Sequence, residues 1–223
     1  MGDAPTSAAP SVRAGRPPLT ERRKAATRLE IAEVAVRLFA RKGVAATSAD
    51  EIAAEAGVST RTLWRYFPTK EACVQPLLAV GVDSLAEALR ASSGEEPLID
   101  ALEAMRPDTM RPTAGSEDVL SLVRLTRTEP GLRAVWLQTH LEAEPVLAEA
   151  LAERTGESPD ALAPRVAAAM INVALRVAAE EYAWKRERTD RTLDEVARDA
   201  LRIAAEVLRQ GPGSVEEAGA AGR

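Results

Sequence analysis

The chain has 223 residues, 46% of them hydrophobic and 28% charged, which is an ordinary composition for a soluble globular protein. Its formal charge of −5 would disfavour nucleic acid if it were evenly spread, but residues 1–75 hold 12 Lys and Arg against 8 Asp and Glu. A basic N-terminal part on an acidic body leaves one end able to bind phosphates. Aromatic residues make up only 3%, so Ala, Leu and Val must pack the body, which favours helices over sheets.

The sequence lacks the marks of several other protein classes. Cys73 is the single cysteine, so no intramolecular disulfide can form, and we expect it to pack in the core. We find no uninterrupted apolar run of membrane length and no hydrophobic signal core, which predicts a cytoplasmic protein without a membrane partner. There is no phosphate-binding glycine loop, HExxH motif or cysteine pair, so no cofactor and no metal are expected.

Residues 1–18 are rich in Ala, Pro, Ser and Gly and are predicted to form a disordered basic arm. Its basic run comprises Arg13, Arg16, Arg22, Arg23, Lys24 and Arg28. Such an arm can reach a DNA minor groove, or it can be no more than a solubilising tail. A first helix is predicted over residues 20–42. Its buried stripe at helical spacing is Ile31, Val34, Ala35, Leu38 and Phe39.

Two short helices separated by a glycine turn are predicted within residues 47–67. Ser48 can cap the first helix, with Glu51 three residues later as its capping-box partner. Gly57 ends this helix, because glycine readily takes the left-handed conformation that a tight turn needs. Ser59 offers a cap for the second helix.

The second short helix has an apolar side and a basic side. At about 100° per residue, Leu63 and Phe67 fall together and are predicted to be buried. The opposite side carries Arg61 and Arg65, flanked by Thr62 and Trp64. Because Arg can form two hydrogen bonds to guanine and Thr can contact a base edge, this side has the chemistry of a helix that reads the DNA major groove.

Residues 47–71, TSADEIAAEAGVSTRTLWRYFPTKE, resemble the DNA-binding signature of TetR-type transcriptional regulators, including the F-P-x-K-E step after the helix. Trp64 departs from the pattern, since the family more often has Tyr there. The resemblance implies a three-helix, helix-turn-helix head at residues 19–67 and a phosphate contact by Lys70. The residues expected to contact DNA are Ser48, Ser59, Thr60, Arg61, Thr62, Trp64, Arg65, Tyr66 and Lys70.

The body is predicted at residues 68–210. Thr69 can cap a helix that runs to about residue 92, which Pro76 and Gly81 should bend or weaken. Further helices are predicted near residues 98–106 and 119–128 and from Pro130 onward, with a break or kink at Pro145. Residues 107–116 read as a turn-rich loop.

Two long helices with apolar stripes are predicted at residues 159–187 and 193–208. Together they carry more apolar surface than one body must hide. In TetR-type proteins the last two helices form a four-helix dimer bundle, so the resemblance implies a homodimer through these helices. An intrachain hairpin is the alternative. The tail, residues 211–223, is predicted to be disordered.

The segments EPGLRAVW at residues 129–136 and LAEALAERTG at residues 147–156 resemble the TetR subgroup whose effector domain binds acyl-CoA-like ligands. This resemblance implies a small apolar or amphipathic effector, acyl-CoA-like in that subgroup, bound in the body. The candidate lining residues, each of which can instead be plain core, are Met105, Leu122, Leu125, Trp136, His140, Met170 and Trp184.

The sequence therefore predicts an all-α, two-part regulator that is not an enzyme. We expect a repressor that binds a palindromic operator in double-stranded DNA as a homodimer and is released by its effector. Two alternatives stay open. One is a helical protein-interaction module with a non-functional head. The other is a small-molecule-converting enzyme, for which one histidine and one cysteine supply no complete catalytic set.

Overall fold

The computed structural model describes residues 19–92, 98, 102, 117–185 and 190–210. Its elements in order are α1 (Leu19–Lys42), α2 (Ala49–Glu55), α3 (Thr60–Tyr66), the 3-10 helix η1 (Glu71–Val74), α4 (Gln75–Ala91), α6 (Glu117–Leu125), α7 (Pro130–Thr155), α8 (Leu162–Lys185) and α9 (Leu193–Gln210). No strand occurs in these residues, which confirms the all-α prediction. The expected arm at 1–18, the loop at 107–116, the tail at 211–223, and Met105 with most of the expected helix at 98–106 lie outside the described residues.

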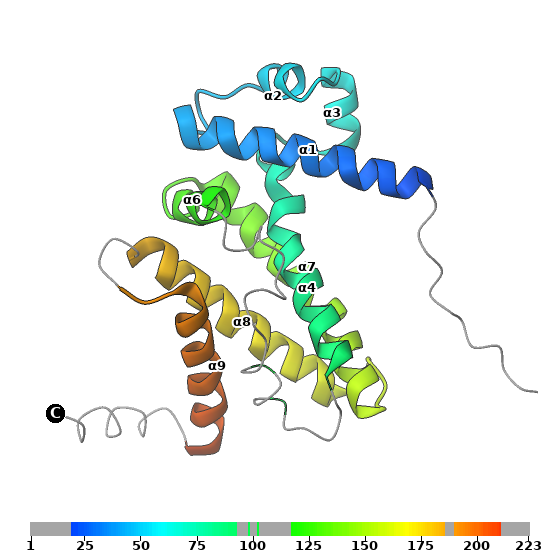
Figure 1. Ribbon diagram of the computed structural model, residues 1–223, viewed down its shortest axis with the longest axis vertical. Helices are drawn as coiled ribbons and strands as arrows, with labels where there is room; N and C mark the ends of the chain where they lie inside the picture. Colours follow the sequence, from blue (N-terminus) through cyan, green and yellow to red (C-terminus); the bar gives the residue numbers. More distant parts are fainter. Residues whose placement is uncertain (1–18, 93–97, 99–101, 103–116, 186–189, 211–223) are drawn as a thin grey trace, which may run out of the picture.

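The helices form a head at one end and a longer body below it (Figure 1). We call α1–α3 the head and η1–α9 the body. In the head, α2 and α3 lie above α1, and α4 leads down from this layer beside α7. At the far end α8 packs against both α7 and α9. The head therefore presents α2 and α3 at one extremity of the molecule.

The hydrophobic core of the head continues into the body. The stripe of α1 is buried as predicted, and Leu63 and Phe67 are 0% and 1% exposed. The same cluster extends through Cys73 to Leu122 of α6 and Leu132 of α7. Burial raises the pKa of the Cys73 thiol to about 12, which agrees with the packing role expected for it. A second cluster, from α4, α7, α8 and α9, packs the far end. Head and body are thus joined by shared packing.

Proline effects in α4 and α7 differ from the predictions. Thr69 does cap the segment, since its hydroxyl accepts from the Ala72 N–H at 3.1 Å, but the first turn is 3-10 and α4 begins at Gln75. Pro76 therefore lies in the first turn of α4, where its missing N–H costs little. The predicted break at Pro145 is wrong, because α7 runs from Pro130 to Thr155. Pro145 and Leu141 are both exposed, so water can reach the Leu141 carbonyl that the proline leaves unpaired.

Two helical stretches, Glu71–Ala91 and Leu162–Lys185, are long and apolar enough to cross a bilayer by length and composition alone. Neither is an uninterrupted apolar run, because Asp83 and Glu87 interrupt the first and Arg165, Arg176 and Glu180 interrupt the second. The apolar window of the first stretch is 50% buried and that of the second is 33% buried within the body. The first behaves as a core helix, whereas α8 leaves much of its apolar side uncovered.

Candidate nucleic-acid interface

The start of α2 is fixed by a dense set of local hydrogen bonds. Gly43 ends α1 with φ of 85°, and the Thr47 hydroxyl donates to the Gly43 carbonyl at 2.8 Å. Ser48 then caps α2, because its hydroxyl accepts from the Glu51 N–H at 3.2 Å while the Glu51 carboxylate accepts from the Ser48 N–H at 2.9 Å. The predicted capping box is confirmed, and it sets the direction in which α2 leaves α1.

The turn between α2 and α3 is closed by Gly57, which has φ of 67°. Ser59 caps α3 as predicted, accepting from the Thr62 N–H at 3.1 Å. Its hydroxyl also lies 2.8 Å from the Thr62 hydroxyl. The Thr60 hydroxyl donates to the Asp50 carboxylate at 2.6 Å, which ties α3 directly to α2. These bonds hold the two short helices as one unit although each has only seven residues.

One side of α3 is open to solvent and the other is sealed. Arg61 and Arg65 are exposed, and Trp64 is 46% exposed, while Leu63 lies in the core. The Arg65 guanidinium carbon lies 5.1 Å from the centroid of the Tyr66 ring, so that ring supports this arginine. The predicted division of α3 into a basic outer face and an apolar inner face is confirmed.

The nine residues predicted to contact DNA gather around α2, α3 and the following step, but several already have intramolecular partners. The hydroxyls of Ser48, Ser59, Thr60 and Thr62 are engaged as described above. Lys70 is partly buried, and its ammonium donates to the carbonyls of Val44 and Thr47 at 2.7 and 2.8 Å. These contacts position the backbone, and the predicted phosphate contact by Lys70 stays a prediction.

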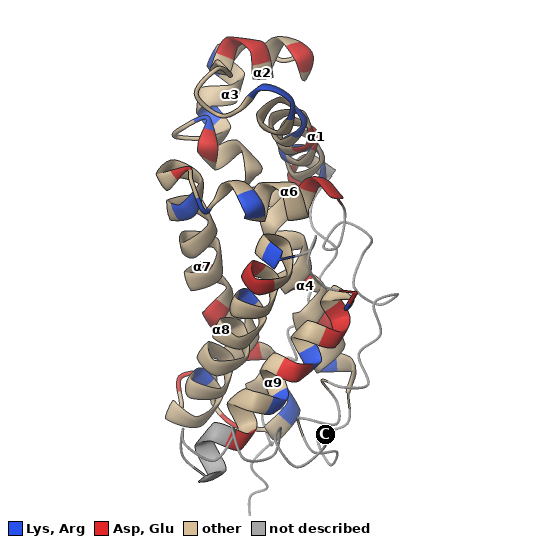
Figure 2. Cartoon of the chain, turned by 90° about the vertical axis from the view of Figure 1, so that its left-hand side faces the viewer, with Lys and Arg blue, Asp and Glu red and all other residues tan. Residues whose placement is uncertain are grey.

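Acidic residues of α2 lie close to this face, as the red segments in Figure 2 show, and would repel phosphates if left free. Each is matched by a donor or cation. Thr60 bonds Asp50, Lys42 pairs with Glu51 at 2.5 Å, and Arg41 pairs with Glu55 at 3.4 Å. The hydrogen bond from Lys42, together with those from Ser48, lowers the pKa of Glu51 to about 2. Pairing thus limits the negative field beside α3.

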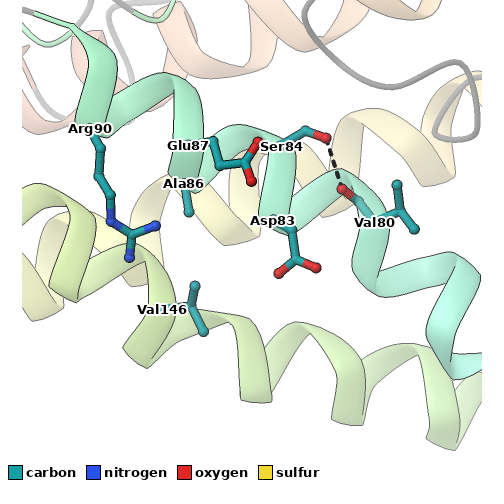
Figure 3. A pocket seen from close by; sticks show the side chains of 7 residues that line it. All are labelled: Val80, Asp83, Ser84, Ala86, Glu87, Arg90 and Val146. Atoms are coloured by element: carbon teal, nitrogen blue, oxygen red, sulfur yellow. Dashed lines mark hydrogen bonds between the residues drawn. The ribbon is translucent and has the colours of Figure 1, made fainter. Parts of the chain in front are cut away.

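The residues predicted to line an effector pocket lie mostly in the packed upper body. Leu122 and Trp136 are buried, and Leu125, His140, Met170 and Trp184 are partly buried. The Trp184 indole N–H donates to the Val123 carbonyl at 3.3 Å. A hollow of about 230 Å³ lies instead between α4 and α7, beside Asp83, Glu87 and Arg90 of α4 and Val146 of α7 (Figure 3). It contains none of the predicted lining residues.

The contact between α7 and α8 contains a buried polar cluster that the sequence analysis missed. One carboxylate oxygen of Glu180, a residue only 6% exposed, accepts from Arg133 at 2.8 Å, Arg176 at 3.0 Å and the Trp136 indole at 2.8 Å. The four-residue spacing of Arg176 and Glu180 was a visible signal for one of these pairs. The bonds from α7 fix how the two helices are aligned.

His140 continues this polar contact along α7. Its Nδ1 lies 2.7 Å from the Asn172 side-chain oxygen, and its ring meets the Trp136 ring edge to face at 4.2 Å. Burial lowers the pKa of His140, although the bond to Asn172 opposes this. Among the described residues, no group of three or more His, Cys, Asp or Glu is arranged to hold a metal ion.

Comparisons with known proteins match both parts of the chain. The sequence model for "Bacterial regulatory proteins, tetR family" matches residues 31–77, and that for the "MftR C-terminal domain" matches residues 96–209. The regulator TcmR of Streptomyces glaucescens is 31% identical over 182 residues, covering 78% of this chain and 80% of that protein. A Mycobacterium tuberculosis protein provisionally named as the mycofactocin biosynthesis regulator MftR is 29% identical over 177 residues, covering 75% of this chain and 84% of that protein.

Among solved structures, the fatty acid degradation regulator FadR from Bacillus halodurans superposes with a TM-score of 0.51 at 20% identity, covering 82% of this chain and 96% of that one. At this identity the likeness shows the fold alone. The sequence matches go further, because the C-terminal model spans half of the chain and TcmR passes 30% identity over most of both proteins. The chain therefore belongs to the TetR family of bacterial transcriptional regulators, which are DNA-binding proteins with a ligand-binding C-terminal domain and are not enzymes.

Proposed function

We propose that this regulator is a repressor that binds a palindromic operator as a homodimer and is released by a small apolar or amphipathic effector. The observation that carries the proposal is the split surface of α3. Its arginines and Trp64 face solvent at one extremity of the molecule, while Leu63 is fully buried in the core of the head. A short helix held in this way can enter a major groove with its outer side first.

Some side chains of α3 are available to DNA, and others are engaged within the head. Within the described part of the chain, no hydrogen bond or ion pair engages the side chain of Arg61 or of Trp64, so both side chains are free to meet DNA. Arg61 can take a guanine edge, and Trp64 can contact a thymine methyl or donate to a phosphate. Arg65 reaches the same groove from its place beside Tyr66. The paired hydroxyls of Thr60 and Thr62 hold α3 in place.

The uncovered face of α8 supports the homodimer. Its exposed large apolar residues are Leu162, Val166, Val173 and Val177. Their spacings of four, seven and four residues read the same in both directions. A second α8 crossing antiparallel about a twofold axis would therefore set Leu162 against Val177 and Val166 against Val173, so the stripe is complementary to itself. We propose this contact as the centre of the dimer interface, with α9 flanking it.

Two further exposed leucines lie beside that stripe. The hydrogen bonds of His140 with Asn172 and of Trp136 with Glu180 show that α7 and α8 run antiparallel. Leu137 and Leu141 come one position after the contact residues Trp136 and His140 of α7, as Val173 comes one position after the contact residue Asn172 of α8. In antiparallel helices this shared offset places the two leucines on the same side as Val173 and Val177. Leu137 and Leu141 are 42% and 59% exposed. The apolar face thus widens onto α7, which suits a subunit interface.

The effector is proposed to bind in the body, where it would favour the arrangement of heads that cannot meet DNA. Only a ligand with different affinities for the two arrangements can shift their populations. The two indoles and the polar α7–α8 contact offer apolar surface together with a few hydrogen-bonding groups, which is the lining that an amphipathic molecule needs. An acyl-CoA-like effector stays a prediction that binding of acyl-CoAs of graded chain length to the purified protein would test.

The test of DNA binding is selection from a random duplex library by the purified full-length protein, followed by affinity measurements at several salt concentrations. We expect an inverted repeat to be enriched. Its affinity should fall by about 10³-fold or more between 50 and 200 mM salt if a dimer makes six or more phosphate contacts. Failure to enrich any sequence, with binding insensitive to salt, would reject the proposal and favour a protein-interaction module.

A further inference from the structure

We infer that Lys70 and Glu71 are positioning residues for operator binding. Lys70 holds the loop from which α2 starts, and Glu71 holds the first turn of α7, so two adjacent residues set the placement of the head on the body. The inference rests on the proposed DNA binding and adds a role for the step between the head and α4. It also assigns Lys70 a role different from the phosphate contact implied by the family resemblance.

Lys70 closes a loop that is already tightly bonded. The Thr47 N–H donates to the Val44 carbonyl at 3.2 Å, and Thr47 is only 1% exposed. The Lys70 ammonium bonds the carbonyls of both residues, at 2.7 and 2.8 Å. It therefore fixes the two ends of the turn that comes directly before the Ser48 cap. Because α2 is tied to α3 through Asp50 and Thr60, this turn also sets the direction of the recognition helix.

Two of the three hydrogens of the Lys70 ammonium are used by these carbonyls. Both acceptors belong to the backbone, and Lys70 comes 26 and 23 residues after them in the chain. A lysine committed in this way contributes to DNA binding through the geometry it maintains. A lysine that neutralises a phosphate would instead contribute through counterion release, which leaves a separate signature in salt dependence.

Glu71, the next residue, makes the contact with the body. A methyl group added at Gly131 would lie 3.0 Å from Cγ and 3.4 Å from Cδ of Glu71, so this side chain rests on the first turn of α7. That turn begins at Pro130, which has no N–H, and the Glu129 side chain makes no capping bond. A carboxylate beside the positive end of a helix is favourable. The same α7 carries Trp136 and His140, so displacement of its first turn would reach the head through Glu71.

Replacement of Lys70 by Met tests the first half. We expect operator affinity to fall about tenfold, the equivalent of roughly one lost hydrogen bond, while the slope of log affinity against log salt stays at the wild-type value. Lys70→Arg should restore most of the affinity, because a guanidinium can donate to both carbonyls. Lys185→Met, which removes an exposed lysine of α8, is the matched control and should change neither quantity.

A slope for Lys70→Met that is smaller in magnitude by about 0.9, the value for one phosphate contact, would overturn the inference. Wild-type affinity in Lys70→Met would overturn it as well. Affinities are to be measured at temperatures where circular dichroism shows each variant fully folded.

Gly131→Ala tests the second half and leaves Lys70 intact. The added methyl should displace Glu71 and weaken operator binding about threefold. Glu71→Ala, which removes the same contact, should weaken binding by a similar factor, and the double variant should bind no more weakly than either single variant. Equal affinity of Gly131→Ala and wild type, or losses that multiply in the double variant, would contradict the role of Glu71. If the wild type selects no DNA sequence, the proposed function fails. A cycle of unfolding free energies for the same four proteins still tests the Glu71–Gly131 contact.

Discussion

The head is packed around fully buried Phe39 and Phe67, whereas the far end of the body is packed by leucines and alanines of α4, α7, α8 and α9. The head helices α2 and α3 are short, so capping side chains and the Thr60–Asp50 bond determine where each begins and how the two lie. The body helices are long, and small residues let them approach closely while polar contacts such as that of Glu180 align them. The two short helices of the head are thus positioned mainly by local hydrogen bonds, whereas the body is held by contacts between helices that are distant in the sequence.

The largest expected effect comes from the uncovered face of α8. Val166→Glu combined with Val173→Glu should place charges where two copies of α8 meet and yield monomers in analytical ultracentrifugation. Operator affinity should fall about 100-fold or more, because the second half-site is no longer bound within the same complex. Ser158→Glu, an exposed position before α8, is the control and should stay dimeric. A dimeric double variant would show that the interface lies elsewhere.

The packing difference between head and body predicts unequal costs of truncation. Phe67→Ala should lower the free energy of unfolding by about 3–5 kcal/mol, because it empties a fully buried aromatic site. Ala178→Gly, at a buried position of α8, should cost only about 1 kcal/mol, mainly through helix propensity. Chemical denaturation measures both. Similar losses in the two variants would contradict the contrast drawn between the two cores.

The polar contact between α7 and α8 should contribute less than the aromatic core of the head. Glu180→Ala leaves Arg133, Arg176 and the Trp136 indole without their shared acceptor. Because the arginine side chains are 34% and 21% exposed and can find water, we expect a loss of about 2 kcal/mol, below the usual cost of breaking a fully buried pair. Glu180→Gln keeps one acceptor and should lose less. A neutral Glu180→Ala would show that the cluster does not stabilise the fold.

The smallest effect concerns pH. The folded-state pKa of His140 is lowered, chiefly by burial, so its stabilising contribution is complete above the unfolded value near 6.5 and is lost as the pH falls below it. The slope should be at most about 1.4 kcal/mol per pH unit. His140→Gln should reduce the pH dependence of the free energy of unfolding between about pH 6.5 and 5, roughly the range below the usual histidine pKa. The stabilising contribution of the lowered pKa of Glu51 is complete above its usual value of 4.5 and is lost only in more acid solution. An unchanged pH dependence in His140→Gln would contradict the assignment.

The parts of the fold that could be predicted depend on residues close in sequence. The caps by Ser48 and Ser59 and the burial of Leu63 and Phe67 follow from spacings of a few residues, and all are confirmed. The backbone partners of Lys70, and the bonds of Glu180 with Arg133 and Trp136, were not predicted, because these residues lie 23 to 47 positions apart in the chain. The uninterrupted course of α7 through Pro145 was also missed, since it depends on which side of the helix faces water.

Base preferences of the wild type and Arg61→Ala in parallel selections test most directly whether the outer side of α3 reads DNA sequence. We expect an inverted repeat for both proteins, with one base position in each half-site relaxed in Arg61→Ala and an affinity loss of about 1–3 kcal/mol. Identical base preferences and affinities for the two proteins would contradict it.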